Sequence, residues 1–236
     1  MNSDITYFIS SSKIFTDLTI EESFGYYGKV LNIGMPRNDV LINRIDYEKV
    51  RQQTRNELGL LGKVVLYAPT FRGKVDCTEA LSFEIPYDKI YKKLASLFDN
   101  VTILFRGHYY SNQKILTSSR IMDVSDYPDM QKLLCAADIL ITDYSSCMWD
   151  FALTNKPCLL YVPDIKNYED GRGLYSPIEK WPGKVCVTED ELIETIGLID
   201  EKDYRNIALA HLDYCGNYET GRATETVIQE IERVLQ

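Results

Sequence analysis

Groups that can bind an anion follow several short apolar runs along this chain. Arginine, histidine and hydroxyl groups supply the hydrogen-bond donors that a phosphate or a pyrophosphate needs. If the runs are neighbouring strands of a parallel sheet, their polar ends meet at one edge and form a single anion-binding pocket. The side chains concerned are Thr70, Arg72, Arg106, His108, Ser125, Asp126, Asp143, Ser145 and Ser146.

The elements that must position these groups alternate along the chain. Short apolar runs predict strands at residues 64–68, 101–105, 121–124, 139–141, 158–161 and 185–187. Helical spacing of apolar residues predicts helices at residues 46–58, 87–98, 129–137, 189–199, 202–212 and 223–235. Strands that alternate with helices are typical of an α/β fold, and they predict a doubly wound parallel sheet.

The stretch at residues 138–161 indicates how a strand end can present such groups. A strand at residues 139–141 runs into Asp143, Ser145 and Ser146, and a helix begins at once. Unpaired N–H groups at a helix start attract anions. Two interpretations of the serines are open: a hydroxyl caps the helix, or the hydroxyls bind a phosphate. The convergence of the other strand ends favours the phosphate site, and one serine can cap while the other binds.

Residues 1–34 differ in organisation from the rest of the chain. They read as two short strands, at residues 5–9 and 30–33, around a helix at residues 13–24. One such unit cannot bury both of its faces. We therefore predict that residues 1–34 are the remnant of a preceding N-terminal domain and its linker, and that residues 35–236 form a Rossmann-like domain. The alternative is a segment folded onto that domain.

One connection in the second half of the chain is unusually long. Residues 163–182 are aromatic and charged with almost no periodicity, which predicts a binding loop. Upstream of this loop, Trp149 and Phe151 are predicted to be core residues on a helix face rather than ligand contacts.

Charge and cysteine usage exclude several classes of function. A net charge of −9 disfavours nucleic-acid binding, which needs a basic face. The six cysteines are scattered and only two histidines accompany them, so no zinc site is expected and a reduced, cytoplasmic protein is favoured. No signal peptide and no apolar stretch of about 18 residues is present. The lack of a Walker-type or dinucleotide-type glycine loop disfavours kinases, GTPases and NAD enzymes.

Five motifs in a fixed order resemble those of one family. They are GMPRND at residues 34–39, YAPTFR at 67–72, RGH at 106–108, TDYSS at 142–146 with Asp150 and Phe151, and RGLY at 172–175 with Tyr168 upstream. Together they resemble the CDP-glycerol glycerophosphotransferases, which are the teichoic acid primases and polymerases of bacterial cell walls and capsules. The segment at residues 214–223 resembles the family's closing motif, with Glu219 where aspartate is usual.

The resemblance implies the C-terminal half of a two-domain transferase of the GT-B type, with the nucleotide donor bound to the Rossmann-like domain. The proposed general base of the family is a histidine of the missing N-terminal domain. No cofactor is expected, and the lack of an Asp-x-Asp pair favours a site in which arginines and a helix dipole replace a metal ion. The implied catalytic residue is His108, and the implied substrate-binding residues are Thr70, Arg72, Arg106, Asp143, Ser145, Ser146 and Arg172.

The implied reaction moves glycerol phosphate, or a related polyol phosphate, from CDP-glycerol to a polyol-phosphate or lipid-linked acceptor. This chain would be the donor-binding part, with little turnover alone, and a lipid-linked acceptor would bring it to the inner face of the cell membrane. Two alternatives are a GT-B glycosyltransferase that uses a UDP or CMP sugar, and a nucleotide-binding module without catalysis.

Overall fold

Six parallel strands form the central sheet, in the order β5-β4-β3-β6-β7-β8. The computed structural model describes residues 5–70, 85–107, 121–174 and 176–236. Counted from β3, this order is 3-2-1-4-5-6, which confirms the predicted doubly wound parallel sheet. The strands are β3 (Lys63–Ala68), β4 (Val101–Phe105), β5 (Ile121–Asp123), β6 (Ile139–Thr142), β7 (Cys158–Tyr161) and β8 (Lys184–Cys186).

Alternate residues of the central strands face two separate cores. In β3, Val64 and Leu66 pack into one apolar cluster, while Val65 and Tyr67 pack into the other. All four side chains are at most 2% exposed. Because the strand is buried on both faces, its sequence is a continuous apolar run without polar alternation.

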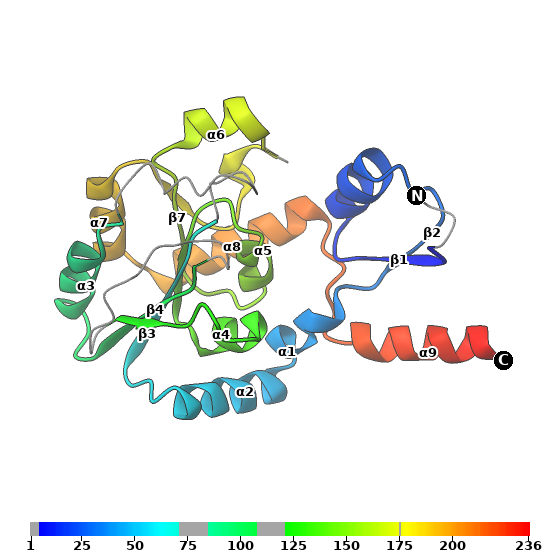
Figure 1. Ribbon diagram of the computed structural model, residues 1–236, viewed down its shortest axis with the longest axis horizontal. Helices are drawn as coiled ribbons and strands as arrows, with labels where there is room; N and C mark the ends of the chain where they lie inside the picture. Colours follow the sequence, from blue (N-terminus) through cyan, green and yellow to red (C-terminus); the bar gives the residue numbers. More distant parts are fainter. Residues whose placement is uncertain (1–4, 71–84, 108–120, 175) are drawn as a thin grey trace.

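Helices cover both faces of the sheet (Figure 1). One core includes side chains of α2 (Arg44–Glu57), α4 (Met130–Ala136) and α5 (Cys147–Ala152). The other includes side chains of α3 (Tyr87–Ala95), α7 (Glu189–Gly197) and the start of α8 (Glu201–Cys215). Two short helices, η2 (Pro36–Asn38) and α1 (Asp39–Ile42), lead into α2.

The first residues build a separate unit. Strands β1 (Tyr7–Ser10) and β2 (Lys29–Asn32) pair in parallel around the π-helical segment η1 (Phe15–Ser23). The last helix, α9 (Ala223–Leu235), lies beside them (Figure 1) and is joined to β2 by an ion pair of 2.6 Å between Lys29 and Glu230. We call residues 5–34 together with α9 the small unit. Its origin in a preceding domain stays a prediction.

The prediction that residues 163–182 form a loop without regular structure is wrong in part, while their binding role stays a prediction. This segment contains the helix α6 (Ile165–Arg172) and the short turn η3 (Ile178–Lys180). The helix carries few apolar residues, so its sequence lacks the periodicity that would have revealed it. Among all the helices that the structure describes, none is long and apolar enough to cross a membrane.

Candidate functional site

The ends of β3 and β6 meet at the centre of the carboxyl edge of the sheet. The carboxylate of Asp143, 2% exposed, accepts hydrogen bonds from the Thr70 amide at 2.9 and 3.0 Å and from Thr70 Oγ1 at 2.7 Å. The Tyr144 amide donates to the same carboxylate at 2.6 Å. These bonds join the two strands that flank the topological switch point, where ligands of open α/β sheets bind.

A second polar anchor connects the ends of β4 and β5. The hydroxyl of Ser125 accepts a hydrogen bond from the Gly107 amide at 2.9 Å and donates one to Asp123 Oδ1 at 2.6 Å. The described carboxyl ends of β3, β4, β5 and β6 are therefore tied together in pairs at one edge. This agrees with the prediction that the polar strand ends converge.

Arg106 brings a positive charge to this edge. Its guanidinium is half-buried and donates from Nη1 to the carbonyl oxygen of Tyr127 at 2.6 Å. Burial lowers the pKa of Arg106, and the nearby Cys147 and Asp129 oppose that shift. An arginine keeps its proton in such surroundings. Arg106 is therefore a cation, and its interaction with Cys147 indicates that it lies close to the first residue of α5.

The two serines before α5 differ in their contacts. Burial raises the pKa of the Cys147 thiol to about 11, although the nearby Ser145 and Thr142 oppose this shift. Ser146 occupies the N-cap position of α5, but its side chain makes no capping hydrogen bond and is exposed. The capping interpretation is therefore wrong for Ser146, whose hydroxyl is free to meet a ligand.

Three of the predicted site residues cannot be placed relative to this edge. Arg72 and His108 belong to residues 71–84 and 108–120, which lie outside the described residues. Arg172 is the last residue of α6, and its side chain also lies outside them. Their roles stay predictions from the sequence.

Aromatic contacts attach α6 to the end of β6. The rings of Tyr144 and Tyr168 stack with centroids 3.6 Å apart and an interplanar angle of 10°. Tyr144 also donates a hydrogen bond to Asp164, immediately before α6, at 3.1 Å. The helix is thus attached to the residue that follows Asp143.

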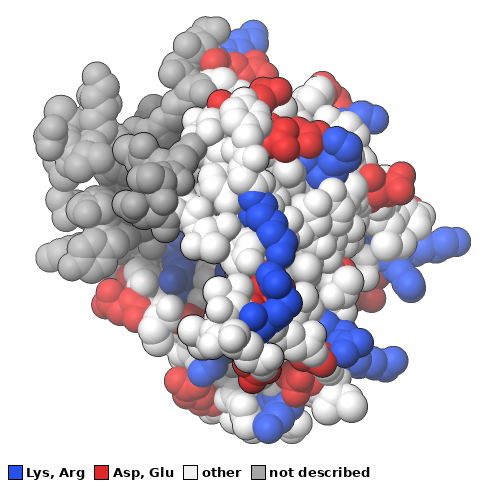
Figure 2. All heavy atoms as spheres, turned by 90° about the vertical axis from the view of Figure 1, so that its right-hand side faces the viewer, with Lys and Arg blue, Asp and Glu red and all other residues white. Residues whose placement is uncertain are grey.

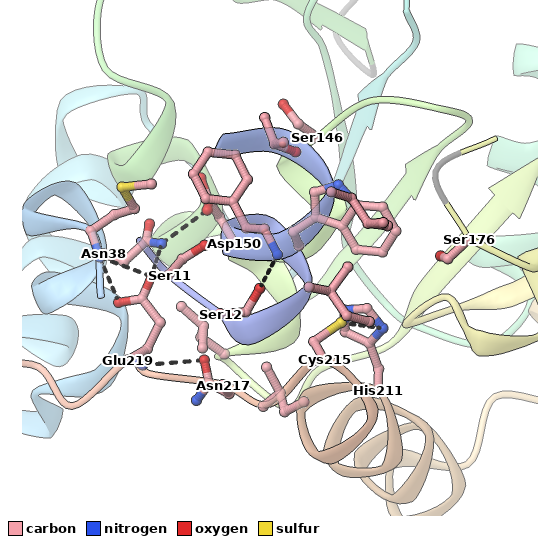
Figure 3. Close-up of a pocket in the computed structure, with 18 of the residues that line it drawn as sticks. Ser11, Ser12, Asn38, Ser146, Asp150, Ser176, His211, Cys215, Asn217 and Glu219 are labelled. Atoms are coloured by element: carbon pink, nitrogen blue, oxygen red, sulfur yellow. Dashed lines mark hydrogen bonds between the residues drawn. The ribbon is translucent and has the colours of Figure 1, made fainter. Parts of the chain in front are cut away.

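A cavity of about 450 Å³ separates the small unit from α5 and α8 (Figure 3). Ser146 lines it at one end, so the cavity adjoins the carboxyl edge. Three polar side chains of the matching motifs, Asn38, Asp150 and Glu219, also line the cavity. Their position in the matching motifs was the only sequence signal for them.

His211 also lines the cavity, but its ring is committed to packing. It is 5% exposed, stacks on Trp149 with centroids 4.9 Å apart, and donates from Nδ1 to the carbonyl oxygen of Lys180 at 2.7 Å. Burial lowers the pKa of His211. Trp149 and Phe151 both pack against the core, as predicted.

A doubly wound parallel sheet with polar strand ends at its switch point defines a Rossmann-like α/β domain. The family model described as CDP-Glycerol:Poly(glycerophosphate) glycerophosphotransferase matches residues 1–233. The chain belongs to this family, which confirms the resemblance found in the sequence.

Three curated relatives illustrate the similarity. A teichoic acid glycerol-phosphate transferase of Staphylococcus aureus (strain NCTC 8325 / PS 47) is 34% identical, over 86% of this chain and 54% of the relative. The teichoic acid ribitol-phosphate polymerase TarK of the same strain is 31% identical, over 90% and 42%. A teichoic acid poly(glycerol phosphate) polymerase of Bacillus subtilis (strain 168) is 32% identical, over 94% and 30%. The chain therefore spans between 30% and 54% of these relatives' length.

Solved structures agree with the family. A variant of the wall teichoic acid polymerase TagF matches with a TM-score of 0.83 and 31% identity, over 97% of this chain and 57% of that chain. A TagF structure soaked with CDPG also matches with a TM-score of 0.83. These matches confirm the predicted fold class, a Rossmann-like sheet of the GT-B type.

Proposed function

We propose that this chain forms the donor-binding part of an enzyme that transfers a polyol phosphate from a CDP-linked donor to a teichoic acid acceptor. The observation that carries the proposal is the carboxyl edge. Thr70 and Asp143 are locked across the switch point, and the half-buried Arg106 and the exposed Ser146 flank them. The family and the TagF structure soaked with CDPG support the same class of donor.

In the proposed reaction, an acceptor hydroxyl attacks the β-phosphorus of the donor. A new P–O bond forms while the bond to the bridging oxygen breaks, and CMP leaves with that oxygen. Negative charge that builds on the CMP phosphate is stabilised by fixed donors. Arg106 would supply one of them, and the sequence assigns Arg72 and His108 to the same task. The hydroxyl proton passes to a base on the remaining part of the enzyme.

A donor panel tests this proposal. The relatives are named for glycerol phosphate and for ribitol phosphate, so CDP-glycerol and CDP-ribitol are compared with a UDP sugar in a thermal unfolding experiment. A donor at a hundred times its Kd stabilises the folded chain by about 2.7 kcal/mol. We expect this from a CDP-linked polyol and not from the UDP sugar. Equal stabilisation by the UDP sugar would instead favour a glycosyltransferase.

The small unit supports the proposal of a larger enzyme. Phe24, Tyr27, Ile231 and Leu235 are between 53% and 80% exposed, and Figure 2 shows a broad uncharged surface crossed by a short row of basic side chains on the corresponding face. We propose that the rest of an N-terminal domain covers these side chains and supplies the general base. Fusion of this chain to the remaining part of the Staphylococcus aureus glycerol-phosphate transferase is expected to give transfer of glycerol phosphate from CDP-glycerol to the acceptor.

The acceptor and the location belong to the same proposal. A polyol-phosphate chain attached to a lipid would bring the enzyme to the cytoplasmic face of the cell membrane. Co-flotation of the fused protein with vesicles that contain the lipid-linked acceptor tests this, and vesicles without the acceptor are the control. Equal flotation with both would argue against acceptor-directed attachment.

A further inference from the structure

The motif at residues 34–39 lies where the chain crosses from the small unit to the sheet. Its first residue, Gly34, has a φ of +87°, and a Cβ atom there would lie 2.4 Å from the Glu219 carboxylate. Its last residue, Asp39, accepts hydrogen bonds from the Ala223 and Thr224 amides at 2.9 and 2.8 Å, at the start of α9. The outgoing and the returning crossings of the chain are therefore packed against each other.

Asn38 links three segments at this point. Its Nδ2 donates to Asp150 Oδ1 at 2.9 Å and to Glu219 Oε1 at 2.8 Å, and the side chain is 1% exposed. The amide cannot be turned over, because its oxygen would then face two carboxylates. As a result Asn38 Oδ1 is buried and accepts no hydrogen bond from any described residue. A buried acceptor without a hydrogen bond lowers the stability of the fold. The two bonds from Asn38 Nδ2 to Asp150 and Glu219 therefore form despite this loss of stability.

Asp150 is the centre of the junction. It accepts bonds from Arg37 Nε at 3.0 Å, Arg37 Nη2 at 3.1 Å, Asn38 Nδ2 at 2.9 Å and Gln131 Nε2 at 3.0 Å. It lies on α5 one helical turn after Ser146, and it is 8% exposed. Two other segments, η2 and α4, thus hold one carboxylate, which fixes how the first turn of α5 is rotated.

We infer that Asp150 is a positioning residue for donor binding. Through Arg37 and Asn38 it holds the turn with Ser145 and Ser146 in register with the crossing between the two units. The inference rests on the proposed function, because it assigns the donor phosphate to that turn. It implies that donor affinity depends on a junction beyond the carboxyl edge itself, and that a shift of the small unit changes the donor site.

The variant Asp150→Asn tests this inference. It keeps the size of the side chain but removes the charge that Arg37 contacts. CDP is titrated calorimetrically at a temperature where circular dichroism shows the variant to be folded. We expect about tenfold weaker binding, which corresponds to the loss of one hydrogen bond between charged groups. Arg37→Lys, which removes the two-point contact and keeps the charge, is expected to weaken binding about threefold.

Asp17→Asn is the matched control. It breaks an exposed ion pair between Lys13 and Asp17, whose N–O distance is 2.6 Å, and neither residue belongs to the junction. We expect it to bind CDP like the wild type. A purely structural role of Asp150 would lower the melting temperature but leave the Kd of the folded variant unchanged, and that result would overturn the inference. Should Asp150→Asn not fold, the Arg37→Lys titration decides by the same criterion.

Amide hydrogen exchange separates this inference from the proposed function. The inference predicts that Asp150→Asn speeds exchange of the amides at residues 145–149 more than of those in β6. If the wild type binds no CDP, the proposed function fails, while the exchange rates still decide whether Asp150 positions this turn. Unchanged exchange at residues 145–149 would overturn the inference on its own.

Discussion

The amino edge of the central sheet holds a cluster of basic side chains and the carboxyl edge holds Arg106, and the two edges differ in what these charges contact. At the amino edge, Arg51, Arg55 and Lys156 surround Asp138 at N–O distances of 2.6, 3.2 and 3.9 Å. The Val64 amide donates to the same carboxylate at 2.8 Å. Burial would raise the pKa of Asp138, but the bond from Val64 and the charge of Arg51 hold this pKa below its usual value.

Further donors at the amino edge bind backbone carbonyl groups. Arg51 Nη1 donates to the carbonyl oxygens of Cys135, Ala136 and Ala137 at 2.9, 3.1 and 3.2 Å. Lys156 donates to the Ala137 carbonyl at 2.7 Å. Such bonds satisfy the free carbonyl groups at the end of α4. The amino edge is therefore a structural cluster with little capacity for a ligand.

The carboxyl edge contrasts with this arrangement. Arg106 has one carbonyl contact, and within the described part of the chain no carboxylate forms an ion pair with it. The Ser146 hydroxyl nearby is exposed. A cation with unused donors beside the switch point can take an anion, whereas a cation that is bound to a carboxylate and to helix carbonyls stabilises the fold. The hydrogen-bond partners of a basic residue thus indicate whether it can bind a ligand or stabilises the fold.

The largest effect is expected at the amino edge. Asp138→Asn leaves two half-buried guanidinium groups without their carboxylate, and it should lower the free energy of unfolding by about 3 kcal/mol. Urea titration measures this loss. CDP affinity of the folded variant, measured at low temperature, should equal that of the wild type. A folded Asp138→Asn variant with weakened CDP binding would break the contrast between the edges.

The pH dependence of stability tests the same edge. Burial and the nearby Arg51 lower the pKa of Lys156 to about 8. Between pH 8 and the ordinary lysine pKa of about 10.4, the unfolded chain binds more protons than the folded one, so stability rises with pH and is lost as the pH falls through 8. Lys156→Met should remove this rise, which amounts to about 3 kcal/mol. Parallel urea-unfolding profiles of the two proteins against pH would contradict the burial of this charge.

Exchanging arginine for glutamine at each edge gives a direct contrast. Arg106→Gln should weaken CDP binding about tenfold, because a charged hydrogen bond to phosphate is lost, and should change the free energy of unfolding by less than about 1 kcal/mol. Arg51→Gln should instead leave CDP affinity unchanged and lower the free energy of unfolding by more than about 1 kcal/mol. Calorimetry and urea titration of both variants check this, and equal CDP affinity of wild type and Arg106→Gln would count against the proposed site.

The smallest effect concerns the serine that does not cap. Because Ser146 makes no capping bond, Ser146→Ala should cost less than about 0.5 kcal/mol of stability while weakening CDP binding about twofold to threefold. The control is Thr188→Ala at the start of α7, where Thr188 accepts a true capping bond from the Glu191 amide at 3.2 Å. That change should cost about 1 kcal/mol and leave binding unchanged. Similar losses of stability in both variants would indicate that Ser146 caps α5 after all.

Much of this fold could be predicted because its strands are buried on both faces. A strand such as β3 then forms one apolar run, and the alternation with helices follows from the parallel sheet. The helix α6 could not be predicted, because it depends on the stack of Tyr168 on Tyr144 rather than on an apolar stripe of its own. Contacts between distant segments leave no periodic pattern.

The candidate site was predictable in part for the same reason. Parallel strands bring Thr70, Arg106 and Ser146 to one edge, whatever their spacing in the sequence. The sequence did not reveal that the Asp143 carboxylate is engaged by Thr70, or that Asn38 bridges Asp150 and Glu219. Both depend on which side chains meet after folding, which local pattern does not encode.

The contrast between the two edges is tested most directly by titrating the isotope-labelled chain with CDP and following its amide resonances. We predict saturable shifts at Thr70, Gly107 and Ser146, at the carboxyl edge, and unchanged resonances at Val64 and Asp138, at the amino edge. Shifts centred on the amino edge, or no shifts at saturating CDP, would contradict the account.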